Sequence, residues 1–354
     1  MYLDFFKLKE FPFRLTPDTE FLYMSNAHAR AKAYMDYSVW NREGFVVITG
    51  EIGCGKTILI KKLLSELEED NFLVAKIFQT QLDEVEFLQA VLVEYGLNPF
   101  SAKKVELIDM LNTFLVDSYR EMKQLVLIVD DAHNLSLKAL EEIRMLSGLE
   151  TQKEKVLHVI LVGQPQLNAM LDAPELEQLV QRVRLRFHVR PLVLDEMAEY
   201  IAHRLKVAGT TRTDLFTPET MPVIYKYTGG VPRLINTLCD TALTVAYADS
   251  LPTVTINILK EALDELQWQP FERRAGRHGK PALKGDRSHT VREQDKLIAN
   301  IGNRLNQMDS LVPSLSLISD RMASIEALLT SVVALLKGKS ERESPPRKAG
   351  GKDH

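Results

Sequence analysis

One glycine-rich stretch constrains this 354-residue chain more than any other feature. Residues 50–57 follow the pattern G-x-x-x-x-G-K-T, which is typical of loops that bind phosphate groups. The apolar residues 45–49 before it predict a buried parallel strand, and the spacing of residues 58–67 after it predicts a helix. Strand, loop and helix in this order direct backbone N–H groups and a helix N-terminus toward an anion. We therefore favour a phosphate site over a chance glycine-rich turn.

The residue types in the loop fit this chemistry. Glycines let the backbone wrap around phosphates without a Cβ in the way. Lys56 brings a positive charge to the β- and γ-phosphates, and Thr57 brings a hydroxyl to Mg²⁺. Cys54 is a filler position, although an exposed thiol beside a helix N-terminus would be readily ionised, and its modification would then block nucleotide binding. The predicted nucleotide-binding residues are Gly50, Glu51, Ile52, Gly53, Cys54, Gly55, Lys56, Thr57 and Ile58.

A second apolar stretch ends in two acids. Residues 125–129 predict a buried strand that delivers Asp130 to the end of the sheet beside the phosphates, where it can hold Mg²⁺. Asp131 follows at the position expected of a general base for an attacking water. An apolar run ending in Asp-Asp is a weak signal alone. At this distance from a phosphate loop it is a strong one.

Three further segments bear on such a site. After a predicted strand over residues 157–162, Gln164 would either contact the γ-phosphate or the water, or cap the next helix. Residues 180–187 alternate arginine with apolar side chains, which predicts a strand whose arginines are either solvated or reach a neighbouring subunit's nucleotide. Arg233 follows a Gly-Gly turn and a proline at a helix start, which suits a phosphate contact across the domain cleft.

Charge is distributed unevenly along the chain. From Phe271 onward there are 16 Lys and Arg against 10 Asp and Glu, a balance of +6, so the first 270 residues carry −10. A solvated linker explains the basic part best, and a weakly bound lipid surface or nucleic acid is the alternative. Two distant cysteines, no opening signal peptide and no apolar stretch of roughly 20 residues predict a cytoplasmic protein without an integral membrane segment, either free or peripheral to the inner membrane.

The patterns divide the chain into six segments. Residues 297–337 repeat apolar side chains in steps of three and four, so we favour a coiled coil, split at Pro313, over an amphipathic helix on a membrane or partner groove. The segments are 1–40, an N-terminal arm covering the nucleotide site; 41–190, an α/β core; 191–268, an all-helical lid; 269–296, a basic linker; 297–337, the repeat; and 338–354, a disordered tail.

In this order the features resemble the AAA+ superfamily and, more narrowly, the general secretion pathway protein A group of ExeA-like ATPases. The layout is most similar to members associated with exosortase and exopolysaccharide genes. The resemblance implies a P-loop NTPase fold: a three-layer αβα parallel sheet, a C-terminal all-helical lid and a coiled-coil-like tail. The matching residues are Phe11-Pro12-Phe13, Thr16-Pro17-Asp18, Ile48 to Gly53, Leu161 to Pro165, His203-Arg204-Leu205, Ala208-Gly209 and Gly230 to Asn236.

The resemblance implies an ATPase that uses ATP and Mg²⁺, with Lys56 and Thr57 on the nucleotide and Asp130 on the metal. The superfamily usually has glutamate where this chain has Asp131. A base held one methylene further back predicts slow hydrolysis, because proton transfer depends steeply on geometry.

The resemblance also implies that Gln164 is the first sensor and Arg233 the second. It suggests Arg182 as the arginine finger of a homo-oligomer, with Arg184 and Arg186 as alternatives. The function we expect is an oligomeric regulator or assembly factor for envelope secretion or exopolysaccharide export. A transposition-type DNA-binding ATPase and a nucleotide-gated scaffold are the alternatives, and the acidic first 270 residues count against DNA.

Overall fold

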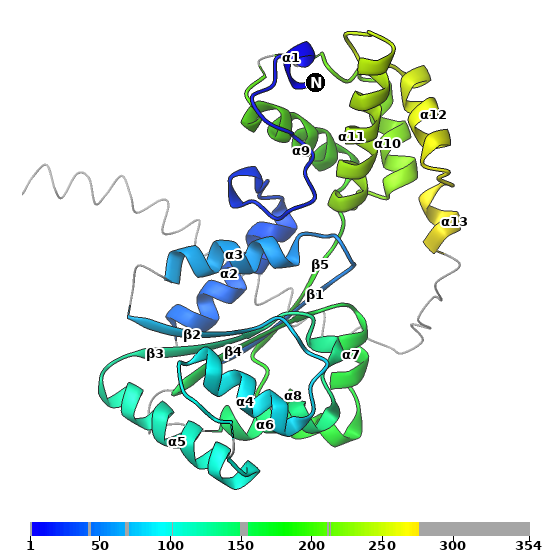
Figure 1. Cartoon of the computed structure of the whole chain (residues 1–354). Helices are drawn as coiled ribbons and strands as arrows, with labels where there is room; N and C mark the ends of the chain where they lie inside the picture. The colour runs from blue at the N-terminus through cyan, green and yellow to red at the C-terminus, as the bar shows by residue number, and fades with distance from the viewer. Residues whose placement is uncertain are drawn as a thin grey trace, which may run out of the picture. The chain divides into compact units, whose positions relative to one another are not determined.

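The β-branched and leucine-rich segments form one parallel sheet (Figure 1). The structure, a computed structural model, describes residues 2–41, 44–67, 71–100, 102–148, 155–210, 212 and 214–275. Its strands are β1 (Phe45–Gly50), β2 (Phe72–Ile77), β3 (Gln124–Val129), β4 (Leu157–Gly163) and β5 (Leu185–Val189). Their order is β2-β3-β4-β1-β5, and all neighbours are parallel. The glycine loop therefore leaves the sheet between the ends of β4 and β5.

Alternate strand residues face two different layers of helices. On β1, Phe45 and Val47 join one buried cluster, whereas Val46 and Ile48 join another. A strand buried on both faces has no polar face, which explains the continuous apolar sequence. The first cluster includes α4 (Glu84–Glu94), α5 (Lys104–Arg120), α6 (Leu137–Leu146), α7 (Gln166–Leu171), η3 (Pro174–Leu176) and α8 (Glu177–Val180), with η2 (Ala132–Asn134) beside them. The second includes α2 (Asn26–Trp40) and α3 (Lys56–Leu67).

The lid has its own apolar core. A parallel bridge between Phe216 and Val254 ties the segments that precede α10 and follow α11. Beyond the lid, α13 (Phe271–Ala275) places the Phe271 ring against Gly229. The lid helices are α9 (Leu194–Val207), α10 (Thr220–Thr228), α11 (Pro232–Ala248) and α12 (Ile256–Glu265).

The N-terminal segment packs into the lid core before the chain enters α2. Phe6 and Phe13 are fully or almost fully buried there, among side chains of the lid helices. The Tyr2 hydroxyl donates to Asp240 of α11 at 2.6 Å. This segment contains α1 (Tyr2–Phe6) and the short helix η1 (Thr19–Phe21). The first residues of the chain thus stabilise the lid, and all described residues belong to one compact unit.

The predicted fold class of a three-layer αβα parallel sheet with a helical lid is confirmed. The predicted strand over residues 180–187 is wrong in its first half. The N–H groups of Arg182 and Val183 donate to the carbonyls of Leu179 and Val180 at 3.0 Å, and β5 begins only at Leu185. Leu179 is buried in the apolar cluster that includes α4, α5 and α6, so tertiary packing overrides the alternating pattern.

The C-terminal predictions fall largely outside the described residues. Of the predicted linker, 269–296, only its beginning is described, and it contains α13. The predicted coiled coil at 297–337 and the tail at 338–354 lie wholly outside. Within the described ranges, no helix combines the length and the apolar character that crossing a membrane requires.

Candidate functional site

The glycine loop is a tight connection between β1 and α3. Gly53 and Gly55 have φ angles of +82° and +88°, which residues with a Cβ rarely adopt. A Cβ on Gly50 would lie 2.7 Å from the carbonyl oxygen of Val189 on β5. The loop can therefore lie directly on the sheet end and lead into the 12-residue helix α3. Its N–H groups and the helix N-terminus together favour an anion.

The Lys56 ammonium is held inside this loop. Its Nζ donates to the carbonyl oxygens of Gly50 and Glu51 at 2.8 and 2.9 Å, and the residue is 7% exposed. Burial lowers the pKa of Lys56, because leaving water disfavours the charged form. Two neutral carbonyls do not neutralise an ammonium, so an anion entering the loop would pair with it.

Thr57 and Asp130 meet where α3 begins and β3 ends. The Thr57 hydroxyl donates to Oδ2 of Asp130 at 2.8 Å, and the Asp131 N–H donates to Oδ1 at 2.9 Å. Burial raises the pKa of Asp130, and these two hydrogen bonds act in the opposite direction. The carboxylate is therefore held by directed donors in a partly desolvated position.

This donor set fits Mg²⁺. In phosphate sites Mg²⁺ takes one or two protein oxygens, and water and phosphate oxygens complete its shell. A hydroxyl 2.8 Å from a carboxylate supplies such a pair. The described residues contain no group of three or more His, Cys, Asp or Glu side chains that would hold a metal without a ligand. The Thr57–Asp130 pair thus suits a metal whose remaining ligands are water and phosphate oxygens.

Asp131 has an exposed side chain on a constrained backbone. Its side chain is 54% exposed, and its φ and ψ of 49° and 36° lie in the left-handed region. Oδ1 lies 3.9 Å from Nδ1 of His133, and that nitrogen accepts the Gln164 N–H at 3.4 Å. The His133 ring thus lies between Asp131, which follows β3, and Gln164, which follows β4. A carboxylate open to water in this position can act as a general base.

The lid touches the glycine loop at the start of α11. The Arg233 N–H donates to the Gly53 carbonyl oxygen at 3.2 Å. A Cβ on Gly53 would lie 2.6 Å from the Arg233 Cβ and 3.3 Å from Cγ1 of Val231. The absence of a side chain at Gly53 therefore allows the lid to approach.

Residues 12–25, which we call the strap, run from the lid toward α2. The buried Arg204 of α9 donates to the carbonyl oxygens of Pro12 and Arg14 at 2.5 and 3.1 Å. The Asn236 amide of α11 also donates to the Arg14 carbonyl, at 3.4 Å. Side chains of two lid helices thus hold the strap by its backbone.

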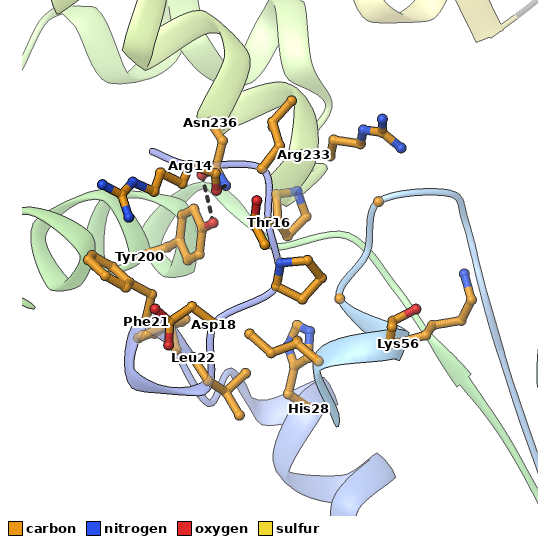
Figure 2. Close-up of a pocket in the computed structure, with 18 of the residues that line it drawn as sticks. Arg14, Thr16, Asp18, Phe21, Leu22, His28, Lys56, Tyr200, Arg233 and Asn236 are labelled. Atoms are coloured by element: carbon orange, nitrogen blue, oxygen red, sulfur yellow. Dashed lines mark hydrogen bonds between the residues drawn. The ribbon is translucent and has the colours of Figure 1, made fainter. Parts of the chain in front are cut away.

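A pocket of about 440 Å³ lies between the strap, the loop and the lid (Figure 2). Leu15, Leu22 and Leu192 supply apolar surface to it. It is also lined by predicted site residues: Lys56, Thr57, Asp131, Gln164 and Arg233. A cleft that combines apolar surface with convergent polar groups suits a small-molecule ligand.

The structure thus brings together most of the predicted site residues, since Asp130 is hydrogen-bonded to Thr57. The three candidate arginines lie elsewhere. Arg182 donates to the Arg144 carbonyl and, at 3.1 Å, to the Ser147 hydroxyl at the C-terminal end of α6. Arg186 forms an ion pair with Asp172 at 2.9 Å. Arg184 precedes β5 and is exposed.

Of the two alternatives for Cys54, the structure supports the filler position and not the exposed, reactive thiol. Cys54 is fully buried, and burial raises its pKa to about 11. The side chain packs with the apolar residues between the sheet and helices α2 and α3.

Sequence reasoning missed the residues that hold the strap, although one signal was present. On α9, Arg204 lies three and seven residues beyond Ile201 and Met197, which are buried. An arginine within an apolar stripe needs buried partners, and here these are carbonyl groups. Tyr200 and Asn236, which also line the pocket, are hydrogen-bonded to each other at 2.7 Å.

Comparison with known proteins defines the class. Residues 40–171 match the family model described as the AAA domain. Together with the sheet order and the glycine loop, this match identifies residues 40–171 as an AAA domain.

The comparisons also identify a nearer relative. The chain is 39% identical over 250 residues to general secretion pathway protein A of Aeromonas hydrophila, which confirms the predicted resemblance. The match covers 70% of this chain and 45% of that protein, so the chain spans about half of its relative's length.

Solved structures share the fold at low sequence identity. The ORC2 protein of Aeropyrum pernix superposes with a TM-score of 0.54 at 17% identity, covering 72% of this chain and 70% of that one. Cdc6p of Pyrobaculum aerophilum gives 0.55 at 15% identity, with the same coverage. These similarities concern the fold alone.

Proposed function

We propose that this chain binds ATP with Mg²⁺ and hydrolyses it. The observation that carries the proposal is the placement of Lys56 and Thr57 at the start of α3, where both line one pocket and Thr57 is hydrogen-bonded to Asp130 at the end of β3. A cation, a hydroxyl and a carboxylate in this arrangement match what a magnesium-bound triphosphate needs. The ORC2 structure that shares the fold is described as holding ADPNP and ADP.

The proposed roles follow from the positions of the side chains. The loop N–H groups and Lys56 would bind the phosphates. Thr57 and Asp130 would hold Mg²⁺, which when bound neutralises charge on the phosphate oxygens. Asp131, open to solvent, would orient and deprotonate the attacking water. Gln164, whose N–H is fixed by the His133 ring, would sense the γ-phosphate or the water.

Lid and inter-subunit arginines would complete the site. Arg233 lies on the lid turn that contacts Gly53, so we assign it the second sensor role. We propose that one of Arg182, Arg184 and Arg186 acts as an arginine finger toward a neighbouring copy in a homo-oligomer. Arg184 is the most exposed of the three residues, whereas Arg182 donates a hydrogen bond to Ser147 at the end of α6.

We propose further that turnover is slow and that the process served is envelope secretion or exopolysaccharide export. The shorter Asp131 side chain supports the first point. The similarity to general secretion pathway protein A of Aeromonas hydrophila supports a role in secretion. Because the chain corresponds to only part of that protein, its partners have to be tested directly. Filter binding to duplex DNA over a salt series tests the transposition-type alternative.

Calorimetric titration with Mg-ADPNP tests the binding proposal. We expect the wild type to bind and Lys56→Ala to lose about tenfold or more in affinity, because a charge-assisted contact to phosphate is removed. Lys138→Ala is the matched control, since its side chain is 77% exposed on α6 and pairs with Glu84. Absence of binding in the wild type, or equal affinity for Lys56→Ala, would refute the proposal.

A further inference from the structure

A buried histidine joins the N-terminal part of the chain to the glycine loop. His28, in the first turn of α2, is 4% exposed. Its Nε2 lies 2.9 Å from the Cys54 carbonyl oxygen, and its Nδ1 lies 2.6 Å from the Ser25 hydroxyl oxygen. A carbonyl oxygen only accepts, so Nε2 carries the hydrogen and Nδ1 accepts from Ser25. The ring is therefore held from both sides.

The ring also lies directly against the loop backbone. A Cβ on Gly55 would be 2.7 Å from the His28 Nε2. Cys54 and Gly55 share one peptide unit, which is planar and trans, so its C=O and N–H point in opposite directions. A hydrogen bond that draws the Cys54 carbonyl toward His28 consequently directs the Gly55 N–H away from the ring. Such an N–H is what a phosphate oxygen in this loop would accept from.

A second set of hydrogen bonds connects the N-terminus of α2 to the lid. Glu196 of α9 is 9% exposed, and its Oε1 accepts the Asn26 N–H at the start of α2 at 3.1 Å. Its Oε2 accepts the Val193 N–H at 3.2 Å. One carboxylate thus fixes the N-terminus of α2 to the N-terminus of α9. The position of His28 over the loop is set by the lid as well as by the core.

We propose that His28 is a positioning residue for the nucleotide: it holds the Cys54–Gly55 peptide with its N–H directed to the phosphates. The inference rests on the proposed binding of ATP by this loop. The Gly55 N–H would contact phosphate equally in the bound substrate and in the transition state. Loss of the His28 hydrogen bond should therefore raise KM and leave kcat nearly unchanged.

Two substitutions separate the hydrogen bond from the packing. His28→Phe fills the space without a donor, whereas His28→Gln places an amide N–H near the position of Nε2. We expect KM for ATP and Kd for Mg-ADP to rise about tenfold in His28→Phe and to recover to within about threefold in His28→Gln. Ser25→Ala, which keeps the ring but removes its orienting hydroxyl, should raise both constants about threefold.

The matched control is His158→Phe. His158 is 1% exposed, but it lies on β4 opposite Val126, toward the strand end remote from the loop. That substitution should lower the melting temperature without changing KM or Kd. Unchanged KM and Kd in His28→Phe and Ser25→Ala, with the wild type binding nucleotide, would overturn this inference alone. If His28→Phe does not fold, Ser25→Ala and His28→Gln decide it. A wild type that binds no nucleotide would overturn both proposals.

Discussion

Gly230 of the lid lies directly on the carbonyl group of Leu192, the residue that leads from β5 into α9. A Cβ on Gly230 would be 1.9 Å from the Leu192 oxygen, and the Leu192 N–H donates to the Gly230 carbonyl at 2.9 Å. The turn that carries Arg233 is thereby fixed to the chain that leaves the sheet. Backbone contacts at Gly230 and at Gly53 hold this arginine over the loop.

Replacing Gly230 by alanine should therefore displace Arg233. Gly230→Ala combines the strain of a φ of +74° with a clash against backbone, and we expect a loss of more than about 2 kcal/mol in the free energy of unfolding. We also expect weaker nucleotide binding. Chemical denaturation and calorimetry measure the two effects.

Gly96→Ala is the matched control for backbone strain. Gly96 has a similar φ of +83° but no atom within 4 Å of the added Cβ. It should lose only about 1 kcal/mol and bind nucleotide normally. Equal losses in the two variants would show that the contact with Leu192 is unimportant.

Lengthening the proposed base should speed hydrolysis. Asp131→Glu moves the carboxylate one methylene outward, and we expect kcat to rise several-fold. The left-handed backbone at this position tolerates aspartate better than glutamate, so the same variant should melt at a lower temperature. Asp131→Asn, which cannot accept a proton, should have almost no activity. A slower Asp131→Glu enzyme would contradict the explanation of slow turnover.

Asp130 should make the nucleotide-free protein less stable as pH rises. Its folded-state pKa is raised above the ordinary value of 3.8, mainly by burial, so its favourable contribution exists at low pH and is lost as pH rises through the folded pKa. Asp130→Asn keeps the shape and removes this charge. We expect it to melt higher than the wild type at pH 8, with a smaller advantage near pH 4.

The same Asp130→Asn variant should lose metal-dependent binding. The gain in nucleotide affinity on adding Mg²⁺ should fall by about tenfold or more, because a metal ligand is lost. Circular dichroism melts and calorimetry with and without Mg²⁺ test the pair of effects. A variant that is destabilised at pH 8 yet keeps the magnesium effect would contradict both assignments.

The loop and the strand ends were predictable because local sequence determines them. Lys56 and Asp130 follow apolar strands, and parallel strands present their carboxyl ends at one edge. The strap was not predictable in the same way, because Arg204 reaches carbonyls about 190 residues away in sequence. Nor was the turn at Arg182 after α8, where burial of Leu179 overrides a strand-like pattern.

Cys54 should resist alkylation in the native protein. With a pKa of about 11, only about one thiol in a thousand is ionised at pH 8, and the side chain is buried. Mass spectrometry after iodoacetamide treatment should show labelling only in denaturant. Labelling should become faster as pH rises, since only the thiolate reacts. Rapid native labelling at pH 7.5 would contradict the buried position.

Arg204 should be the main anchor of the strap. Its guanidinium donates to the carbonyls of Pro12 and Arg14 and lies 4.6 Å from the Phe21 ring centre. Arg204→Met would keep much of the volume but leave those carbonyls without this donor, at about 1–3 kcal/mol each. We therefore expect a loss of about 2–4 kcal/mol, faster proteolysis within residues 12–25 and weaker nucleotide binding.

Arg120→Met is the matched control for Arg204→Met. Arg120 is 74% exposed on α5 and pairs with Asp117 at 3.1 Å, so its loss should change stability by about 0.5 kcal/mol or less. Urea unfolding and limited proteolysis with and without Mg-ADP compare the two variants. Because nucleotide in the pocket would contact the strap, Mg-ADP should slow strap cleavage in the wild type more than in Arg204→Met. Equal protection in both would mean that the strap reaches the pocket without its arginine anchor.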